Sequence, residues 1–211
     1  DTFNLDVNCA RKLISEKTRA IIPVHLFGQC ANMDDVLSFA KDNNLYVIED
    51  SAQSLGASYT LKNGKKLFSG TIGDIGTTSF YPSKNLGAYG DGGAIMTNNR
   101  DLARKIKCIS NHGSISSYNY EYLGVNSRLD ALQAKIASIK LKHLDDWNNR
   151  FREIADIYRK NLSDIVITPV DLSYEEPVYH NFVIRVEAGI RDKLMEFMLS
   201  KGVETKIHYP I

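Results

Sequence analysis

Hydrophobic residues in the first half of the chain follow two alternating spacings. Short apolar runs rich in β-branched residues, typical of buried strands, occur in "RAIIPVHLFG", "LYVIED", "IGTTSFYPS" and "GGAIMTN". After the first run, "MDDVLSFAKDNN" places Met33, Val36, Leu37 and Ala40 on one face of a helix. Strands that alternate with helices pair in parallel, so this half predicts an α/β fold with a mostly parallel sheet.

From about residue 128 the pattern changes to a nearly continuous helix. Residues 128–162 contain no glycine or proline and are rich in good helix formers. Beyond Pro169, "HNFVIRVE" indicates a strand, "IRDKLMEFMLSKG" a helix that ends near Gly202, and "VETKIHYP" another strand. We therefore expect a large domain over residues 1–145 and a small α+β domain over 146–211, joined by the long helix.

The composition limits which kinds of protein this chain can be. The chain has 211 residues, 43% of them hydrophobic, which is enough to bury a core. Its 26 basic and 25 acidic residues are interspersed and give a net charge of +1, which argues against nucleic acid or a membrane surface as the main partner. The one basic cluster (Lys62, Lys65 and Lys66) surrounds Asn63-Gly64 and is typical of a hairpin turn. No apolar stretch approaches the ~20 residues that span a bilayer.

The cysteines and the chain ends add two expectations. Cys9, Cys30 and Cys108 are widely spaced with no C-x-x-C, which favours a reducing cytoplasm over a disulfide framework or a metal site. The chain starts with polar residues that do not resemble a signal peptide, and it stops directly after a predicted strand. We expect a fragment that lacks both ends of a longer protein.

Two charged residues follow predicted strands. Asp50 comes directly after "LYVIE", and Lys84 follows "TTSFYPS". Ligands of open α/β sheets bind beyond the carboxyl ends of the strands. Alone, Asp50 is as typical of a turn as of a functional site, and Lys84 is more typical of a solvated loop. Together they are the two protein groups that pyridoxal phosphate requires, an amine that forms a Schiff base and an acid that keeps the pyridine nitrogen protonated.

Five segments in order resemble the DegT/DnrJ/EryC1/StrS aminotransferases. They are "AIIPVHLFG", "VIEDSAQSLGA", "SFYPSKNLGAYGDGGAIMTNN", "LGVNSRLDALQAKI" and "TKIHYPI", and together they cover essentially the whole chain. The resemblance implies a fold-type-I enzyme with pyridoxal 5'-phosphate as cofactor, which makes amino sugars on nucleotide carriers. It also implies a cytoplasmic homodimer whose active site is shared between subunits, and amino sugars destined for lipopolysaccharide, O-antigen, capsule or antibiotic glycosides.

The resemblance assigns roles residue by residue. Lys84 matches the Schiff-base lysine and Asp50 the acid that pairs with the pyridinium nitrogen. Gln53 matches the side chain set against the cofactor ring and its hydroxyl, and Ser79 a hydroxyl that binds the cofactor phosphate. Asn126 matches a phosphate contact donated by the other subunit.

Several further residues have two interpretations. Arg128 could reach the same phosphate or form a salt bridge at the start of the long helix. His25, Tyr81 and His208 are candidate substrate residues, although each histidine could instead be a hydrogen-bonded structural residue. The tyrosines of "SYNYEYLG" could line a sugar-nucleotide groove or pack a dimer loop, and packing is favoured: Tyr118, Tyr120 and Tyr122.

The sequence departs from the family pattern in two respects. Leu55 stands where relatives often carry histidine, which changes packing near the ring and removes no essential group. The N-terminal segment whose helix binds the cofactor phosphate is not in this sequence, so only part of the phosphate site is expected here.

The resemblance implies amino transfer from glutamate to a keto carbon of a nucleotide-linked deoxysugar, with C3 preferred and C4 as the second choice. Three alternatives remain. A sugar dehydratase of the family carries histidine in place of Lys84. A non-catalytic or regulatory protein would not need the lysine and acid together. An amino-acid transaminase needs an arginine clamp, for which Arg185 is a candidate in a plain strand pattern.

Overall fold

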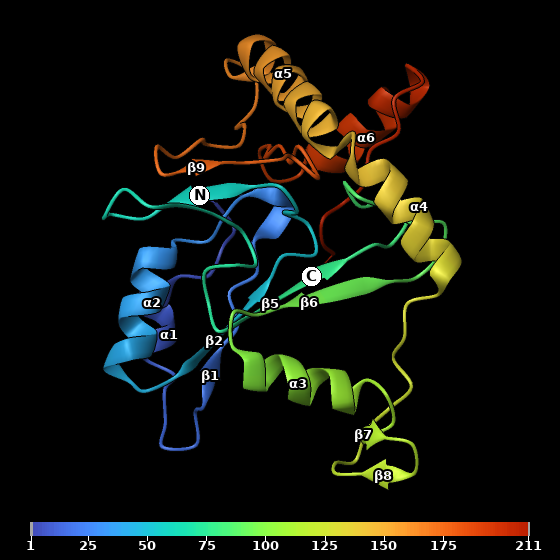
Figure 1. The fold of residues 1–211 in the computed structure, drawn as a ribbon. Helices are drawn as coiled ribbons and strands as arrows, with labels where there is room; N and C mark the ends of the chain where they lie inside the picture. Colours follow the sequence, from blue (N-terminus) through green and yellow to red (C-terminus); the bar gives the residue numbers. More distant parts are fainter. Residues whose placement is uncertain (1, 211) are drawn as a thin grey trace.

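A mixed four-stranded sheet organises the fold. The computed structural model describes residues 2–210, and its main sheet has the order β1-β2-β5-β6. Strands β1 (Ala20–Ile21), β2 (Tyr46–Asp50) and β5 (Ile75–Ser79) are parallel, whereas β6 (Gly93–Met96) runs antiparallel to β5 (Figure 1). The predicted mostly parallel α/β sheet is confirmed.

Helices α1 (Val7–Arg11), α2 (Met33–Asp42) and α3 (Arg100–Ile109) accompany this sheet, and a short 3₁₀ turn, η1, spans Leu26–Gly28. Helix α2 begins at the predicted residue because the side chain of Asn32 accepts a hydrogen bond from the main-chain N–H of Asp35. Its buried face consists of Met33, Val36, Phe39 and Ala40. The predicted helix is confirmed, with Phe39 more deeply buried than Leu37.

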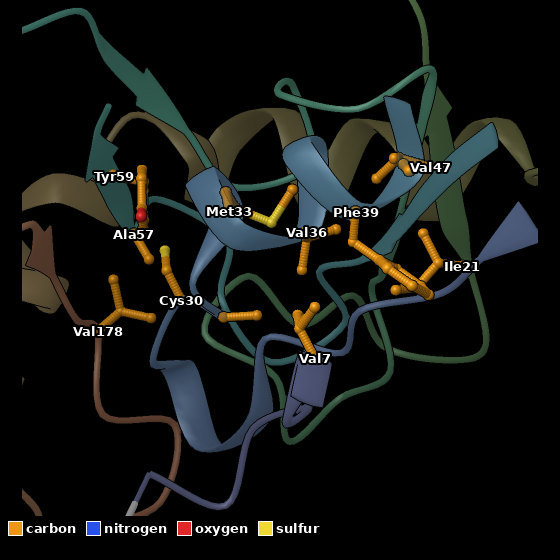
Figure 2. Packing of buried hydrophobic residues seen from close by; sticks show 12 residues of the cluster. Val7, Ile21, Cys30, Met33, Val36, Phe39, Val47, Ala57, Tyr59 and Val178 are labelled. Atoms are coloured by element: carbon orange, nitrogen blue, oxygen red, sulfur yellow. The ribbon is translucent and has the colours of Figure 1, made fainter. Parts of the chain in front are cut away.

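The main hydrophobic core lies where α2 packs against β1 and β2. Figure 2 shows the ring of Phe39 beside Ile21 of the sheet, and Val36 and Val47 belong to the same cluster. Val178, from far along the chain, belongs to the same cluster and is fully buried. The C-terminal third of the chain therefore contributes to the core of the first half.

A second, three-stranded sheet also joins the C-terminal third of the chain to the first half. Its order is β4-β3-β9, formed by β3 (Ser58–Thr60), β4 (Lys66–Phe68) and β9 (Glu175–Glu176), all antiparallel. The turn between β3 and β4 contains Gly64 at a φ of 84°, where glycine avoids the steric penalty of other residues. The predicted hairpin turn is confirmed.

The helix predicted over residues 128–162 is divided. Helix α4 spans Ala131–Leu141 and α5 spans Leu144–Leu162, with a break at Lys142 and His143. Figure 1 shows α5 and α6 (Arg191–Ser200) at one end of the molecule, and the hairpin of β7 (Ser114–Ser116) and β8 (Asn119–Tyr120) at the other. The division into domains at residue 145 stays a prediction.

Two predicted strands do not form. Residues 180–187 contain only one isolated bridge, between Arg185 and Ile167, and residues 203–210 have no strand pairing. A strand needs an extended neighbour along its length, and within residues 2–210 neither segment has one. The predicted helix between them is confirmed as α6, which ends at Ser200; Lys201 is its C-cap and Gly202, the predicted C-cap, follows at a φ of 78°. The N–H groups of Gly202 and Val203 bond to the carbonyls of Leu199 and Met198.

Two features of the sequence are seen directly in the structure. Cys9, Cys30 and Cys108 are free thiols. Within residues 2–210, no helix combines the length and the hydropathy needed to cross a membrane.

Candidate active site

The carboxyl ends of β2 and β5 lie side by side and hold two of the predicted site residues. Asp50 ends β2 and Ser79 ends β5, and Asp50 is in register with Thr77 of the neighbouring strand. The carboxylate of Asp50 accepts a hydrogen bond from the N–H of Ala52 at 3.0 Å, which orients it within the turn. The structure thus places the acid at the sheet edge where ligands of α/β folds bind.

Lys84 lies in a tight turn that follows β5. Its main-chain N–H bonds to the carbonyl of Tyr81 at 2.9 Å, and the N–H of Ala88 bonds to the carbonyl of Phe80 at 2.7 Å. Gly87 is required at this turn because a Cβ there would lie 2.2 Å from the carbonyl oxygen of Pro82. Glycine therefore permits the turn that brings Lys84 back toward the sheet.

The side chain of Lys84 is half-buried and interacts electrostatically with Asp50. Burial lowers the pKa of the Lys84 amine below its usual value, and the Asp50 carboxylate opposes part of that decrease. An amine with a lowered pKa is more often neutral, and a neutral amine is the nucleophile that attacks a carbonyl. The structure brings together the lysine and the acid that the sequence predicted as a pair.

Gln53 is fixed by both ends of its amide. Its Oε1 accepts a hydrogen bond from the N–H of Phe27 at 2.6 Å, and its Nε2 donates one to the hydroxyl of Tyr209 at 2.9 Å. Ser79 is half-buried, and its Oγ accepts a hydrogen bond from the N–H of Tyr81 at 3.1 Å. The Ser79 hydroxyl keeps its own proton to donate to an anionic group.

The two histidines predicted near the substrate differ in their surroundings. His25 is fully buried, with Nε2 at 2.9 Å from Oε2 of Glu49 and Nδ1 accepting a hydrogen bond from the N–H of Ala31. With both ring nitrogens engaged, this geometry favours the structural role of His25 over the substrate role. His208 has a buried Nδ1 without a hydrogen-bond partner among the described residues, so it keeps a polar atom for a ligand.

The remaining predicted residues lie at other positions. Tyr81 is about half exposed, at 52%. Asn126 and Arg128 line a groove of about 750 Å³ between α3 and strands β5 and β6. Arg128 donates a hydrogen bond to the side chain of Asn111 at 2.8 Å, in place of the salt bridge considered as its alternative. The role of Asn126 in a partner subunit stays a prediction.

His180 also lies at the candidate site, although it was not predicted from the sequence. Burial, followed by the positive charges of Lys84 and His208, lowers the pKa of His180 to about 4. The segment that carries it is anchored beside Lys84, because the side chain of Asn85 donates to the carbonyl of Val178 at 3.2 Å. No motif signalled His180, since it lies in a segment predicted only as a strand.

Asn148 was also missed. It lies on α5, is almost fully buried, and accepts a hydrogen bond from the side chain of Asn85 at 2.9 Å. It also donates to the carbonyl of Leu55 at 3.1 Å. The feature that distinguishes Asn148 is that it is a polar residue buried on a helix. Because burial cannot be read from the sequence, this feature did not identify Asn148 in advance.

The residues present fit pyridoxal phosphate. Lys84 has a half-buried amine with a lowered pKa, close enough to Asp50 for their charges to interact. Gln53 keeps one amide hydrogen beyond its two hydrogen bonds, and Ser79 keeps its hydroxyl proton. These groups supply the amine, the acid and the neutral donors that this cofactor requires.

Comparison with known proteins identifies the same family that the motifs indicated. Residues 1–211 match the sequence profile of the DegT/DnrJ/EryC1/StrS aminotransferase family. A pleiotropic regulatory protein of Geobacillus stearothermophilus is 45% identical, over 100% of this chain and 56% of its own length. A dTDP-3-amino-3,6-dideoxy-alpha-D-galactopyranose transaminase of Aneurinibacillus thermoaerophilus is also 45% identical, over 100% of this chain and 56% of its own length.

The fold agrees with solved structures of the family. DesV of Streptomyces venezuelae, solved in complex with a ketimine intermediate, superposes with a TM-score of 0.91 at 39% identity. The match covers 99% of this chain and 55% of the DesV chain. The chain thus spans about half the length of the curated relatives it matches.

Proposed function

The chain belongs to the DegT/DnrJ/EryC1/StrS aminotransferase family, and on this basis we propose that the protein transfers an amino group to a keto carbon of a nucleotide-linked sugar. Aminotransferases of this family depend on pyridoxal phosphate. The observation that carries the proposal is the placement of two groups at the carboxyl ends of neighbouring parallel strands, Asp50 at the end of β2 and Lys84 in the turn after β5, close enough for their charges to interact.

When bound, pyridoxal phosphate supplies a carbonyl that condenses with amines and a ring that accepts the electron pair left when a C–H bond breaks. In our proposal, Nζ of Lys84 holds the cofactor covalently. When it is not bound to the cofactor, the same Nζ would move a proton between a cofactor carbon and the sugar carbon. Its lowered pKa favours this role because the neutral amine is the form that accepts a proton.

The other residues orient the cofactor in this proposal. The Asp50 carboxylate would keep the proton on the ring nitrogen, and Gln53 would contribute its remaining amide hydrogen to the cofactor. Ser79 would donate its hydroxyl proton to the phosphate, and Asn126 of a second copy would contribute to the same group in a homodimer. The candidate substrate contacts are the exposed Tyr81 and His208, whose Nδ1 has no hydrogen-bond partner within residues 2–210.

We further propose glutamate as the amino donor and C3 as the aminated carbon. The Aneurinibacillus relative, named as a 3-amino-sugar transaminase, supports C3. Amination at C4 is the second choice, and the name of a relative 32% identical, a GDP-perosamine synthase, keeps it open. We place the enzyme in the cytoplasm, with amino sugars for surface polysaccharide or antibiotic glycosides as its products.

A regulatory function is the second candidate, because a relative at 45% identity is named a pleiotropic regulatory protein. Lys84 and Asp50, which lie at the ends of neighbouring strands, favour catalysis, since a regulator has no physical need for a lysine and an acid at the same sheet edge. An amino-acid transaminase is less well supported. Arg185, its candidate carboxylate clamp, has its guanidinium over the ring of Phe3 at 5.6 Å.

The proposal is tested with the full-length protein, glutamate labelled with nitrogen-15, and nucleotide-linked 3-keto and 4-keto sugars. We expect the label to appear in an amino sugar, preferentially from the 3-keto substrate, and NMR of the product locates the amine. Lys84→Ala is the inactive control. Label transfer to keto acids alone would instead indicate an amino-acid transaminase, and no transfer with any substrate would favour the regulatory candidate.

A further inference from the structure

Phe27 occupies an unusual backbone conformation next to the candidate site. Its φ is 60° and its ψ is 7°, and Gly28 follows at a φ of 97°. Non-glycine residues rarely adopt the left-handed region, and they persist there only where surrounding contacts hold them. The side chain of Phe27 is buried. Contacts with the surrounding residues must therefore hold this turn in place.

The main chain of Phe27 determines the orientation of the Gln53 amide. The Phe27 N–H lies 2.6 Å from Oε1 of Gln53. Because a main-chain N–H can only donate, the amide atom that faces it must be the oxygen. The nitrogen of the amide then faces Tyr209, whose hydroxyl accepts its hydrogen bond at 2.9 Å. One hydrogen on Nε2 of Gln53 is left for a further acceptor.

The ring of Phe27 contacts the residues at the other end of this amide. It stacks on the ring of Tyr209, with centroids 6.2 Å apart and planes 24° apart, and meets His208 edge-on at 6.2 Å. One residue thus holds Gln53 through its main chain and supports Tyr209 through its side chain. Gln53 and Tyr209 are 156 positions apart in the sequence.

The turn is also fixed from its opposite side. The carbonyl of Gly28 accepts a hydrogen bond from the N–H of Val178 at 2.9 Å, and the carbonyl of Phe27 accepts one from Asn181 at 3.3 Å. A Cβ on Gly28 would lie only 2.8 Å from the main-chain nitrogens of the next two residues after Val178. This close packing leaves the turn little freedom to change its conformation.

We propose that Phe27 is a positioning residue that couples the seating of Tyr209 to the orientation of the Gln53 amide. The significance of that orientation for the cofactor rests on the proposed function. The same clamp makes the hydroxyl of Tyr209 an acceptor toward Gln53, which leaves the Tyr209 proton free to donate to a substrate. Tyr209 is about half exposed, at 53%, so that proton can be reached by a ligand.

The coupling is tested first in the cofactor-free, full-length protein by hydrogen exchange at the amide of Phe27. Gln53→Ala removes its acceptor, and we expect exchange to accelerate by about tenfold or more. Tyr209→Phe removes only the hydroxyl and should give a smaller acceleration. Tyr46→Phe, which removes an exposed hydroxyl from β2, is the matched control and should change nothing. Unchanged exchange at Phe27 in both site variants would overturn the proposal.

The second test uses the protein loaded with pyridoxal phosphate and follows the pH midpoint of its visible absorption band. Phe27→Leu keeps the main-chain N–H and removes the stacking ring. We expect it to shift the midpoint in the wild-type background and to add nothing in the Gln53→Ala background. Equal shifts in both backgrounds would show that Phe27 acts independently of Gln53 and would overturn the proposal. The absence of a visible band would contradict the proposed function. Hydrogen exchange, which needs no cofactor, would in that case still test the coupling between Phe27, Gln53 and Tyr209.

Discussion

Glu49 and His25 form a fully buried hydrogen-bonded pair directly beside Asp50. Nε2 of His25 lies 2.9 Å from Oε2 of Glu49, and both side chains are completely shielded from solvent. Three main-chain N–H groups also donate to the carboxylate of Glu49, at 2.9, 2.6 and 2.6 Å: Gly70, Ile72 and Gly73. Although burial by itself raises the pKa of Glu49, these hydrogen bonds lower it below its ordinary value.

We predict that Glu49→Gln destabilises the protein strongly. In the variant, an amide NH₂ group would replace one carboxylate oxygen and would face main-chain N–H donors. Those buried N–H groups would then lose their acceptor. The expected loss is about 2–4 kcal/mol in the free energy of unfolding, measured by denaturant titration. Glu196→Gln, an exposed change on α6, is the control and should lie within about 0.5 kcal/mol of wild type. Equal stabilities of the two variants would contradict this role of Glu49.

We predict that Gly28→Ala and Gly64→Ala differ despite similar backbone strain. Both glycines have positive φ, 97° and 84°, so each substitution carries a conformational penalty of about 1 kcal/mol. Gly64 has open space around it, whereas a Cβ on Gly28 would lie 2.8 Å from main-chain nitrogens. The overlap should bring the loss at Gly28 to about 3 kcal/mol or more. Thermal unfolding of the two variants checks this difference, and identical melting temperatures would contradict it.

We predict that the free energy of unfolding falls as pH rises, because Glu175 loses its proton. Burial raises the pKa of Glu175 to about 7, from an ordinary value of 4.5, and its Oε1 has no hydrogen-bond partner among the described residues. The folded state therefore holds the proton more tightly than the unfolded chain. The stabilising effect is complete below about pH 4.5 and is lost as pH rises to about 7.

Glu175→Gln tests this dependence by removing the titration. At pH 8 the variant should be more stable than wild type by about 2–4 kcal/mol, and at pH 4.5 the two should be nearly equal. Denaturant unfolding at both values gives the comparison. Since other groups titrate in both proteins, the difference between the two curves isolates Glu175. A constant difference across this range would contradict the assignment.

We predict that Lys84→Ala raises the pKa of His180. Burial is the main cause of the low pKa of His180, about 4, and the positive charge of Lys84 is the next. Removing that charge should move the titration upward without restoring the ordinary value of 6.5, because the burial remains. NMR titration of the imidazole in the cofactor-free protein measures the shift. Lys107→Ala serves as the control, and an identical titration in all three proteins would show that Lys84 does not interact with His180.

The sequence predicted the elements that are defined by local patterns. The face of α2, the strands β2, β5 and β6, and the turn at Gly64 all follow from hydrophobic spacing or turn chemistry. The segments 180–187 and 203–210 have the composition of strands but lack partners along their length. Strand formation depends on a neighbour that may be distant in sequence, so composition alone predicted them incorrectly.

The candidate site shows the same limit. Lys84 and Asp50 were predicted because each follows a strand and their chemistry is complementary. The contact of Gln53 with Tyr209, and the placement of His180 near Lys84, join segments more than 90 positions apart. Such contacts arise from the packing of the C-terminal third on the first half, which no local pattern encodes.

Borohydride reduction of the full-length protein with pyridoxal phosphate, followed by peptide mapping, tests whether Lys84 is the amine that binds the cofactor. We expect a visible absorption band and a reduced cofactor attached to the peptide that contains Lys84. Both should be absent in Lys84→Ala and retained in Lys107→Ala. Attachment to another lysine, or no attachment to the intact protein, would contradict the claim that Lys84 is the reactive amine of this site.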